Sequence, residues 1–542
     1  MLGVSWENMG DRFSTSSKLV KPDLAFIPGV KQNASGWRIP HNCRKVINPN
    51  YKRRCASDVD LLSGLLSLEK SGVIVDHKEL FDYMLEHQRE GVRSHMLHRS
   101  GHIWDDPGAA KSLQGLVLLL LAGPPYLIVT LRSLRPSWLT RVERFTNLKF
   151  VSLSGRQEHK IDPSKKEVYF CHKEILQYWE DSLGQHKWSM LIDETHTFRD
   201  SKRSSHAAGK FIPARGQAAT AQRLSQRARF RYSLTGTPYG SSAALVWSQL
   251  DIIDPWSWGS AFDFKQRYCK QREEKLNNGK VITQYYGVRR ARELKARFQS
   301  CSIRRQIKDV MDMPSLRVQF PCLSDNEIDR GFGRGNKKDR KEATQGGSLY
   351  QYMLMLCASQ KRSWTAAEVG LRLAQGQKVL VLTGRRVDVD RLEVAIRKEV
   401  SKRNLNCLVD GFSGDNSSAE DREKARIIHR DFKGASCYIG TDATIGIGLD
   451  FQFCSVAIFN MFPTNPNRLR QLMARLVRIG FEGDNIELVL PYIRGTIEEA
   501  NFTKLFRRIS YSRQLTVDEF LNGVEAEFEK QGGQESFLSA FI

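Results

Sequence analysis

Nine short apolar runs recur along the chain, and they limit its possible folds more than any other feature. Most are four to six residues long, rich in Val, Ile, Leu and Tyr, and polar at the C-terminal end. Helical patterns separate many of them, which is typical of parallel strands buried on both faces. The runs are Tyr126–Leu131, Glu167–Phe170, Ser189–Asp193, Tyr232–Gly236, Lys378–Thr383, Cys407–Asp410, Ser436–Thr441, Ser455–Phe459 and Ile486–Tyr492.

These runs form two groups, one before Pro238 and one after Lys378. The 140 residues between those positions (378 − 238 = 140) are too many for a loop. Helical spacing with aromatic residues comes first, a basic helical stretch then ends at Pro314, and Asp325–Ser348 is polar and glycine-rich. We therefore predict an α/β protein with two lobes, each a parallel sheet flanked by helices, and a helical insertion between them.

The predicted boundaries follow these changes in pattern. Residues 1–75 show weak periodicity and receive no role, whereas the C-terminal tail is acidic. The predicted segments are 1–75, then 76–240 as the first lobe, 241–322 as the helical insertion and inter-lobe segment, 323–348 as a flexible basic linker, 349–515 as the second lobe and 516–542 as the acidic tail.

The uncharged stretch Leu113–Leu131 has to be tested against a membrane span. A transmembrane helix needs about 20 consecutive apolar residues. Gly123, Pro124 and Pro125 divide the stretch into two halves that are each too short. The stretch therefore predicts a buried helix, a turn and a buried strand, and we expect no membrane partner.

The N-terminus and the cysteines indicate an intracellular protein. Residues 1–12 have neither a basic start nor a long apolar run, so they do not form a signal peptide. The ten cysteines contain no Cys-x-x-Cys pair that would begin a zinc site, and we expect reduced thiols. A bacterial or phage-infected cell is the expected setting and a nucleus the alternative, because no accessory reader module is recognisable.

The charge of the chain predicts a polyanionic partner. Lys and Arg number 83 against 60 Asp and Glu, which gives a net charge of +23 and a pI near 9.6. Basic side chains bind nucleic acids because their contacts with phosphates release counterions. The alternative is a basic protein whose charge serves solubility alone.

Residues Gly108–Ser112 have the context of a phosphate loop. They follow the strand-like Gly101–Trp104 and open an apolar helix, so backbone N–H groups of Gly108, Ala109 and Ala110 would face a phosphate. Lys111 would reach the β- and γ-phosphates, and Ser112 would bind Mg²⁺. Asp105 and Ala110 stand where glycines are expected, and the alternative is a plain strand–turn–helix.

Two acidic residues supply the chemistry that such a loop needs. Asp193 and Glu194 end a predicted buried strand, and ligands of open α/β sheets bind at the carboxyl ends of strands. Asp193 would hold Mg²⁺, and Glu194 would orient and deprotonate the attacking water. The alternative is a strand that ends in two solvated acids.

Three residues near the end of the chain share one predicted helix face. Gln471, Arg475 and Arg478 are spaced i, i+4 and i+7, between Asn465 and Gly480. Two arginines that face a γ-phosphate from a second lobe would act as arginine fingers, with Gln471 contributing to the nucleotide site. The alternative is a basic surface helix.

These segments together resemble the Swi/Snf-type DNA translocases of helicase superfamily 2. The likeness covers about Leu80 to Phe506, is closest to the HARP-like annealing-helicase branch and its small phage or bacterial relatives, and implies two RecA-like lobes that bind ATP and Mg²⁺ in the cleft between them. It further implies duplex DNA held across both lobes. The segments that carry it are His87–Val92, Asp105–Gln114, Pro125–Leu134 with the following Trp138, Asp193–His196, Ser233–Pro238, Ser302–Pro314, Asn465–Gly480 and Gly495–Glu499.

The resemblance also assigns roles at matching positions. Gln88 corresponds to a glutamine that reads adenine; by itself it would be a solvated helix residue. Thr235 and Thr237 correspond to the motif that couples hydrolysis to lobe movement. Gly448 and Asp450 fall in the motif of the second lobe that faces the cleft and contributes to nucleotide binding.

Contacts to DNA phosphates, which carry no base specificity, are assigned in the same way. The residues are Thr130, Ser133, Thr383 and Thr441. The chain departs from the family pattern at Ala110, at Pro107 and at Ala474, and these departures put the rate of catalysis in question rather than the fold.

Three functions are compatible with the sequence. The first is an ATP-dependent translocase that moves along duplex DNA and remodels forks, annealing strands or protein–DNA complexes. The second is a helicase that separates strands of DNA or RNA, which would need a wedge that is not recognisable. The third is a DNA-binding scaffold whose altered phosphate loop binds ATP weakly. Retention of the catalytic Lys, Ser, Asp, Glu and both Arg favours the first.

Overall fold

A computed structural model describes the following parts of the chain: 4–5, 12–15, 27–33, 36–38, 40–47, 52–155, 161–198, 205–207, 210–212, 216–238, 243–275, 279, 281–312, 314–324, 326–329, 349–413, 418–445, 449–463, 466–481, 483–499 and 501. It divides into two compact units between Val310 and Met311. Most of the predicted linker and the whole of the predicted acidic tail lie outside the described residues.

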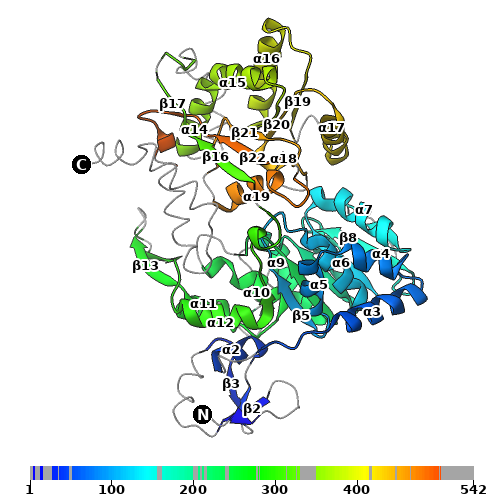
Figure 1. The fold of residues 1–542 in the computed structure, drawn as a ribbon. Helices are drawn as coiled ribbons and strands as arrows, with labels where there is room; N and C mark the ends of the chain where they lie inside the picture. The colour runs from blue at the N-terminus through cyan, green and yellow to red at the C-terminus, as the bar shows by residue number, and fades with distance from the viewer. Residues whose placement is uncertain are drawn as a thin grey trace. The chain divides into compact units, whose positions relative to one another are not determined.

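Unit 1 is built on a seven-stranded sheet in which every strand pairing is parallel. Its predicted strands are confirmed, and the central ones are buried along their whole length because helices cover both faces (Figure 1). In spatial order the strands are β15 (Ser302–Ile303), β5 (Ser100–Ile103), β12 (Phe230–Leu234), β9 (Ser189–Asp193), β6 (Tyr126–Thr130), β8 (Glu167–His172) and β7 (Lys149–Ser152).

The uncharged stretch Leu113–Leu131 folds as predicted. It contains most of helix α6 (Lys111–Leu121) and then strand β6, and every residue from Leu113 to Leu120 is buried. A helix that is apolar on all sides is typical of a core position. Within the described ranges, no helix is long and apolar enough to cross a membrane.

The other helices of unit 1 surround its sheet. They are α3 (Asp58–Lys70), α4 (His77–Tyr83), α5 (Glu86–Arg93), α7 (Arg135–Phe145), α8 (Glu180–Gly184), α9 (Gln217–Arg227), α10 (Trp247–Ile253), α11 (Ala261–Tyr268) and α12 (Ala291–Cys301).

The segment that the sequence predicted as a helical insertion contains more than helices. A hairpin of β13 (Lys270–Lys275) and β14 (Val281–Tyr286) separates α11 from α12. Its first strand is polar and largely exposed, so it lacks the apolar alternation by which strands are recognised. The predicted helical stretch ends at Cys301 and does not continue to Pro314, because Ser302 is extended and β15 joins the sheet beside β5.

The N-terminal region, for which no role was predicted, belongs to unit 1. Strands β1 (Val4–Ser5), β2 (Arg12–Thr15), β3 (Lys31–Asn33) and β4 (Gly36–Arg38) form an antiparallel sheet, followed by η1 (His41–Cys43) and α2 (Arg44–Ile47). Oδ1 of Asn42 accepts a hydrogen bond of 2.8 Å from Nη2 of the fully buried Arg297 on α12. This contact ties the region to α12, because Asn42 accepts bonds from both Nε and Nη2 of the buried guanidinium.

Unit 2 contains a second all-parallel sheet, with six strands. In spatial order they are β16 (Ser315–Gln319), β22 (Asn485–Val489), β21 (Val456–Phe459), β18 (Lys378–Thr383), β20 (Ser436–Thr441) and β19 (Leu408–Phe412). The helices are α14 (Leu349–Gln360), α15 (Arg362–Ala374), α16 (Arg386–Lys402), α17 (Ala419–Asp431), α18 (Asp442–Ile445) and α19 (Pro466–Leu476), and β17 (Cys322–Leu323) pairs with β23 (Tyr492–Ile493). The predicted α/β class with two parallel sheets is confirmed.

Candidate nucleotide-binding site

Three neighbouring strands of unit 1 bring the predicted site residues to one edge of the sheet. In the order β5, β12 and β9, Ile103 is in register with Leu234, and Leu234 is in register with Asp193. The segments that follow these strands are the predicted phosphate loop, the Thr235–Thr237 segment and Glu194. Because parallel strands end at a common edge, segments far apart in the sequence meet here.

The predicted phosphate loop has an unusual backbone. Gly108 has a φ of 91°, and Ala110, the N-cap of α6, lies in the left-handed region with φ 51° and ψ 46°. No side chain caps the first turn of α6, so its N–H groups remain available to a ligand. A left-handed alanine is strained relative to glycine, so the presence of Ala110 where a glycine is expected has an energetic cost.

The loop is held against the Thr235–Thr237 segment by a close contact. A Cβ placed on Gly236 would lie 2.5 Å from Cγ of Pro107, far inside van der Waals contact. Gly236 is therefore required so that the two segments can approach, and Pro107 fills the space that they share.

Lys111 lies among acidic groups. Its Nζ donates a hydrogen bond of 2.9 Å to the carbonyl oxygen of Asp106, two residues before the loop. Burial lowers the pKa of Lys111, while Glu194 and then Asp105 act in the opposite direction. The lysine is thus surrounded by negative charge and oriented by a carbonyl group just before the phosphate loop.

Asp193 is buried and oriented at both of its oxygens. It is 7% exposed; Oδ2 accepts a bond of 3.1 Å from Nε1 of Trp138 on α7, and Oδ1 accepts one of 2.9 Å from the backbone N–H of Glu194. The pKa of Asp193 is raised to about 7, mainly by burial and next by the charge of Glu194, while Lys111 opposes the rise. Such a carboxylate is favoured in its ionised form once a cation lies beside it.

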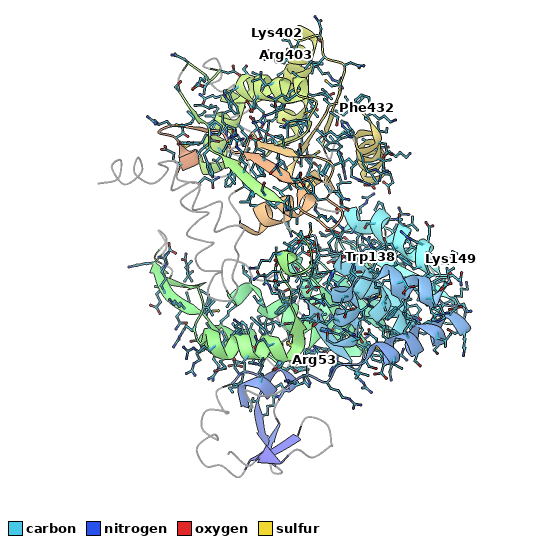
Figure 2. The ribbon with its side chains drawn as sticks, in the orientation of Figure 1. Arg53, Trp138, Lys149, Lys402, Arg403 and Phe432 are labelled. Carbon is cyan, nitrogen blue, oxygen red and sulfur yellow. The ribbon has the colours of Figure 1, made fainter. Side chains whose placement is uncertain are left out.

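Trp138 was not predicted as a site residue. The tryptophan, labelled in Figure 2, is 1% exposed and separated from Asp193 by 55 positions in the sequence. A buried indole N–H requires an acceptor, but the sequence does not show which acceptor it finds.

Glu194 is joined to the predicted coupling residues through His196. Nδ1 of His196 lies 3.1 Å from Oε2 of Glu194 and 2.9 Å from Oγ1 of Thr235. Oγ1 of Thr235 also accepts a bond of 3.2 Å from the N–H of Thr237. Glu194 has a left-handed backbone, with a φ of 53°, and strain of this kind is concentrated at functional sites.

Helix α5 contacts the phosphate loop from the other side. Nε2 of Gln88 donates a bond of 2.9 Å to the carbonyl oxygen of Ala110, and Nε2 of His87 lies 3.0 Å from that of Ala109. Gln88 is 3% exposed, so the interpretation as a solvated residue is wrong. Its predicted contact with adenine stays a prediction, and His87 was not predicted.

Asp105 occupies the position where the sequence analysis expected a glycine. The residue is fully buried, and its carboxylate accepts hydrogen bonds from Arg305 and from Gln114. A glycine could not supply these acceptors. Arg305 lies in a segment that carried the family resemblance, but no role was predicted for it.

In unit 2, the two predicted arginine fingers meet one acidic residue. Nη1 of Arg475 lies 3.5 Å from Oδ1 of Asp450, and Nη1 of Arg478 donates a hydrogen bond to the same oxygen. Helix α19 ends at Leu476, so Arg478 lies beyond the helix. The prediction that Arg478 shares a helix face with Gln471 is therefore wrong. Gln471 is 9% exposed.

The remaining predicted residues are placed as follows. Thr130, Thr383 and Thr441 end strands β6, β18 and β20 and are buried, at 0%, 1% and 4% exposed. Ser133 lies in the short helix η2 (Arg132–Leu134) and is partly exposed. Their contacts with DNA stay predictions, and Gly448 lies outside the described residues.

The chain is similar to known proteins of one family. Residues 44–323 match the SNF2-related domain. A Caenorhabditis elegans protein, the homolog of SWI/SNF-related matrix-associated actin-dependent regulator of chromatin subfamily A-like protein 1, is 24% identical over 468 residues, which cover 81% of this chain and 62% of that protein. The Zorya protein ZorD of Escherichia coli O139:H28 is 22% identical over 503 residues, covering 79% of this chain and 44% of that protein.

The chain therefore spans less than two thirds of the length of these relatives. Among solved structures, a Sulfolobus solfataricus SWI2/SNF2 ATPase core in complex with dsDNA aligns with 79% of this chain and 91% of its own. The identity is 17% and the TM-score 0.36.

Proposed function

The chain belongs to the SNF2-related family, and we propose that it is an ATP-dependent translocase that moves along duplex DNA. The predicted Swi/Snf-type family is confirmed by the match to residues 44–323. Membership of the HARP-like branch stays a prediction.

One observation supports the proposal above all others: a single edge of the unit 1 sheet carries the groups that phosphoryl transfer needs. An uncapped helix N-terminus, Lys111, Asp193 and Glu194 follow strands that end in register. Hydroxyl and carboxylate oxygens, here from Ser112 and Asp193, are the ligands that Mg²⁺ prefers in proteins. The burial of Asp193, which favours its pairing with a cation, agrees with such a site.

Each residue then has a definite part. The N–H groups of the loop and Lys111 bind the phosphates of ATP, and Ser112 and Asp193 hold Mg²⁺, which neutralises charge on the phosphate oxygens. Glu194 accepts a proton from the attacking water, and His196 orients Glu194 relative to Thr235. Gln88 both supports the loop and contacts the base.

We further propose that Arg475 and Arg478 of unit 2 contact the γ-phosphate of the same nucleotide. ATP would then favour a closed arrangement of the two units, and loss of phosphate would release it. Translocation follows if each unit grips the DNA backbone with a strength that depends on this state.

Duplex DNA is the partner that the chemistry favours. The net charge of +23 suits a polyanion. The Caenorhabditis elegans relative is named a regulator of chromatin, which is a DNA assembly. Contacts to phosphates from Thr130, Ser133, Thr383 and Thr441 would hold the backbone without reading bases.

Phosphate release from ATP tests this function. We would compare four conditions, namely no nucleic acid, duplex DNA, single-stranded DNA and RNA, with Lys111→Ala as the inactive control. We expect the strongest stimulation with duplex DNA, and a steep fall of DNA affinity as salt rises.

Three results would contradict the proposal. Equal rates in all four conditions would exclude a nucleic-acid motor. Duplex binding without any turnover would favour the scaffold. Stimulation by RNA alone would favour the strand-separating alternative.

A further inference from the structure

The chain leaves unit 1 through Ser302–Val310, and this exit segment is bonded to the residues that precede the phosphate loop. Strand β15 pairs with the end of β5, and the contacts continue beyond both strands. The N–H of Trp104 donates to the carbonyl oxygen of Ile303 at 2.9 Å, and that of Asp106 donates to the carbonyl oxygen of Arg305 at 3.0 Å. The exit segment and the start of the loop therefore form one continuous ladder.

The side chain of Arg305 adds a buried ion pair to this ladder. Its Nε donates to Oδ1 of Asp105 at 3.0 Å and its Nη2 to Oδ2 at 2.5 Å, while its backbone N–H also donates to Oδ1 at 3.0 Å. The side chain of Asp105 is 0% exposed and that of Arg305 is 11% exposed. Two parallel bonds to one carboxylate fix both distance and orientation.

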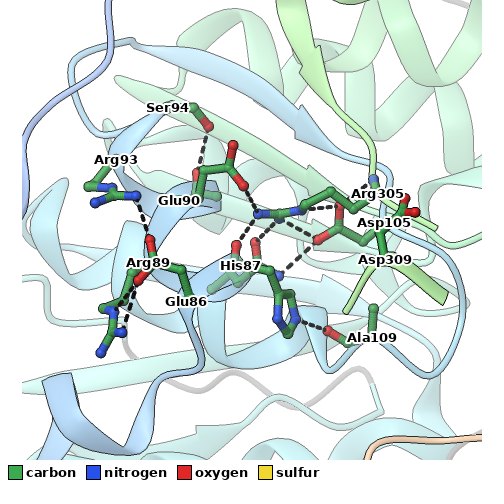
Figure 3. A network of polar contacts seen from close by, with 12 residues as sticks. Glu86, His87, Arg89, Glu90, Arg93, Ser94, Asp105, Ala109, Arg305 and Asp309 are labelled. Carbon is green, nitrogen blue, oxygen red and sulfur yellow. Dashed lines mark hydrogen bonds and ion pairs between the residues drawn. The ribbon is translucent and has the colours of Figure 1, made fainter. Parts of the chain in front are cut away.

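The same guanidinium reaches helix α5. Its Nη1 donates to the carbonyl oxygen of His87 and lies 3.1 Å from Oε2 of Glu90 (Figure 3). A Cβ on Gly91 would lie 2.8 Å from Nη2 of Arg305, so the helix approaches as closely as a glycine permits. His87 in turn contacts the carbonyl oxygen of Ala109 in the loop.

Asp105 is also tied to the helix that follows the loop. Nε2 of Gln114 on α6 donates to Oδ2 of Asp105 at 3.0 Å, and Oε1 of Gln114 accepts from Nη2 of Arg305 at 3.0 Å. One arginine thus connects the exit segment with both helices that flank the phosphate loop.

We propose that Arg305 is a positioning residue that couples nucleotide binding at the phosphate loop to the conformation of the exit segment. The inference rests on the proposed function, since it assumes that the loop binds ATP. Arg305 acts through Asp105 and does not touch the nucleotide. Because the exit segment leads by chain connection into unit 2, Arg305 is placed to transmit the state of the loop along the backbone.

Because of thermodynamic linkage, the proposal can be tested both at the exit segment and by nucleotide affinity. If nucleotide stabilises the exit segment through the Asp105–Arg305 pair, the pair must in turn strengthen nucleotide binding by the same factor. A residue that merely stabilised the fold would change the melting temperature and leave this coupling intact.

The first experiment measures amide hydrogen exchange of Ser302–Val310 with and without a non-hydrolysable ATP analogue. We expect the analogue to slow exchange of the amides of Arg305 and Ile307 by about five- to tenfold, within the usual range of coupling between sites. Lys111→Ala, in which nucleotide binding is weakened at its source, should show no slowing. Unchanged exchange in a wild-type protein that binds the analogue would overturn the inference.

The second experiment removes the ion pair without leaving a buried charge behind. Arg305→Met combined with Asp105→Asn replaces both partners, because either single change would strand the other charge and risk unfolding. We expect this double variant to fold, to bind the analogue about tenfold more weakly and to lose the slowing in the exit segment. Arg305→Lys, which keeps the charge but loses the fork, should lie between the two.

The matched control is Arg93→Met with Asp58→Asn. Arg93, whose side chain is 19% exposed, pairs through Nη1 with Oδ2 of Asp58 at 2.5 Å and through Nη2 with Oε1 of Glu86 at 2.9 Å. Among the described residues, neither contact involves the phosphate loop. We expect its nucleotide affinity to stay within about twofold of wild type, because surface ion pairs contribute little.

The possible failures are distinguishable. If the wild type binds and hydrolyses ATP but the Arg305→Met, Asp105→Asn variant has wild-type affinity and slowing, only the inference is wrong. If the wild type binds no ATP analogue, the proposed function and the inference are both wrong.

Discussion

The two units carry opposite excesses of charge at their predicted sites. In unit 1, Lys111 lies among Glu194, Asp105 and Asp193; Asp105 is neutralised by Arg305, and the two remaining carboxylates still outnumber the lysine. In unit 2, Arg475 and Arg478 share the single carboxylate of Asp450. The first arrangement suits a divalent cation, and the second suits a phosphate that approaches with its own negative charge. The unbalanced charge at each predicted site would therefore be neutralised when Mg²⁺ and ATP bind together.

The largest expected effect concerns the two arginines of unit 2. Arg475→Ala or Arg478→Ala should lower DNA-stimulated ATP hydrolysis by about 10³–10⁵-fold, the usual contribution of an arginine finger. Steady-state phosphate release measures it. Arg430→Ala, whose side chain is 48% exposed and pairs with Asp431, is the control and should leave the rate unchanged. A fall of less than tenfold in both finger variants would show that unit 2 does not contribute to the reaction.

The next largest effect concerns Glu194 of unit 1. Glu194→Gln should lower kcat by about 10²–10⁴-fold, because an amide cannot accept the proton of the attacking water. Nucleotide affinity should change little, since the predicted phosphate contacts come from the loop and Lys111. Rapid-quench measurement of hydrolysis, with equilibrium binding of a fluorescent ATP analogue, separates the two quantities. An equal loss of affinity and rate would assign Glu194 to binding instead.

Asp450 would compete with a phosphate for Arg475 and Arg478, so its replacement tests the charge of the unit 2 site. Asp450→Asn keeps an acceptor oxygen for Arg478 but removes the negative charge that both arginines share. We expect the Kd for ATP to fall by about two- to fivefold, as for a partly exposed charge pair. Titration of an ATP analogue at low and moderate salt measures it. A rise in Kd would indicate that the carboxylate itself, and not only its geometry, positions the arginines.

The buried carboxylate of unit 1 predicts a pH dependence of stability. Burial raises the pKa of folded Asp193 to about 7, above the value near 4 of an unfolded chain. The folded state then holds the proton more tightly, so its free energy of unfolding falls as pH rises from about 4 to about 7. Asp193→Asn removes this loss and should stabilise the nucleotide-free protein by up to about 4 kcal/mol at pH 8, the free-energy equivalent of a rise in pKa from about 4 to about 7.

Urea unfolding of wild type and Asp193→Asn between pH 5 and pH 8, without Mg²⁺, checks this dependence. The two free energies should converge as pH falls. A constant difference across this range would show that the carboxylate is not the titrating group.

The smallest effect concerns the strained loop. Ala110→Gly removes the strain of a left-handed alanine, which stabilises the folded state by about 1–2 kcal/mol. The glycine also makes the unfolded chain more flexible, which opposes folding by about 0.4–1 kcal/mol. The net stabilisation should be about 0.5 kcal/mol, measured by urea unfolding. Ala109→Gly, at a buried position that has no positive φ, is the matched control and should destabilise the protein.

The sequence was a good guide wherever burial follows a local period. All nine apolar runs became strands, and Leu113–Leu131 became a helix and a strand as predicted. It failed at the β13–β14 hairpin, because polar residues that face solvent leave no pattern. It also placed Arg478 on a helix that ends two residues earlier, since helix ends are poorly encoded by spacing alone.

At the site, the sequence supplied the residues but not their partners. Asp105 was interpreted as a departure from a glycine pattern, whereas the fold gives it a buried arginine 200 positions away. Trp138 and Arg305 both lay in segments that carried the resemblance, and nothing local marked their hydrogen-bond acceptors.

The amino-acid sequence by itself determined that the chain forms two parallel sheets and that Lys111, Asp193 and Glu194 follow elements of one of them. Local periodicity and the chemistry at strand ends are sufficient for this, because they depend on a few neighbouring residues. Only the tertiary structure decided which charges pair, as Arg305 with Asp105 and Arg478 with Asp450. Such pairs depend on the order of strands in the sheet, and crossover connections set that order over distances that no local pattern records.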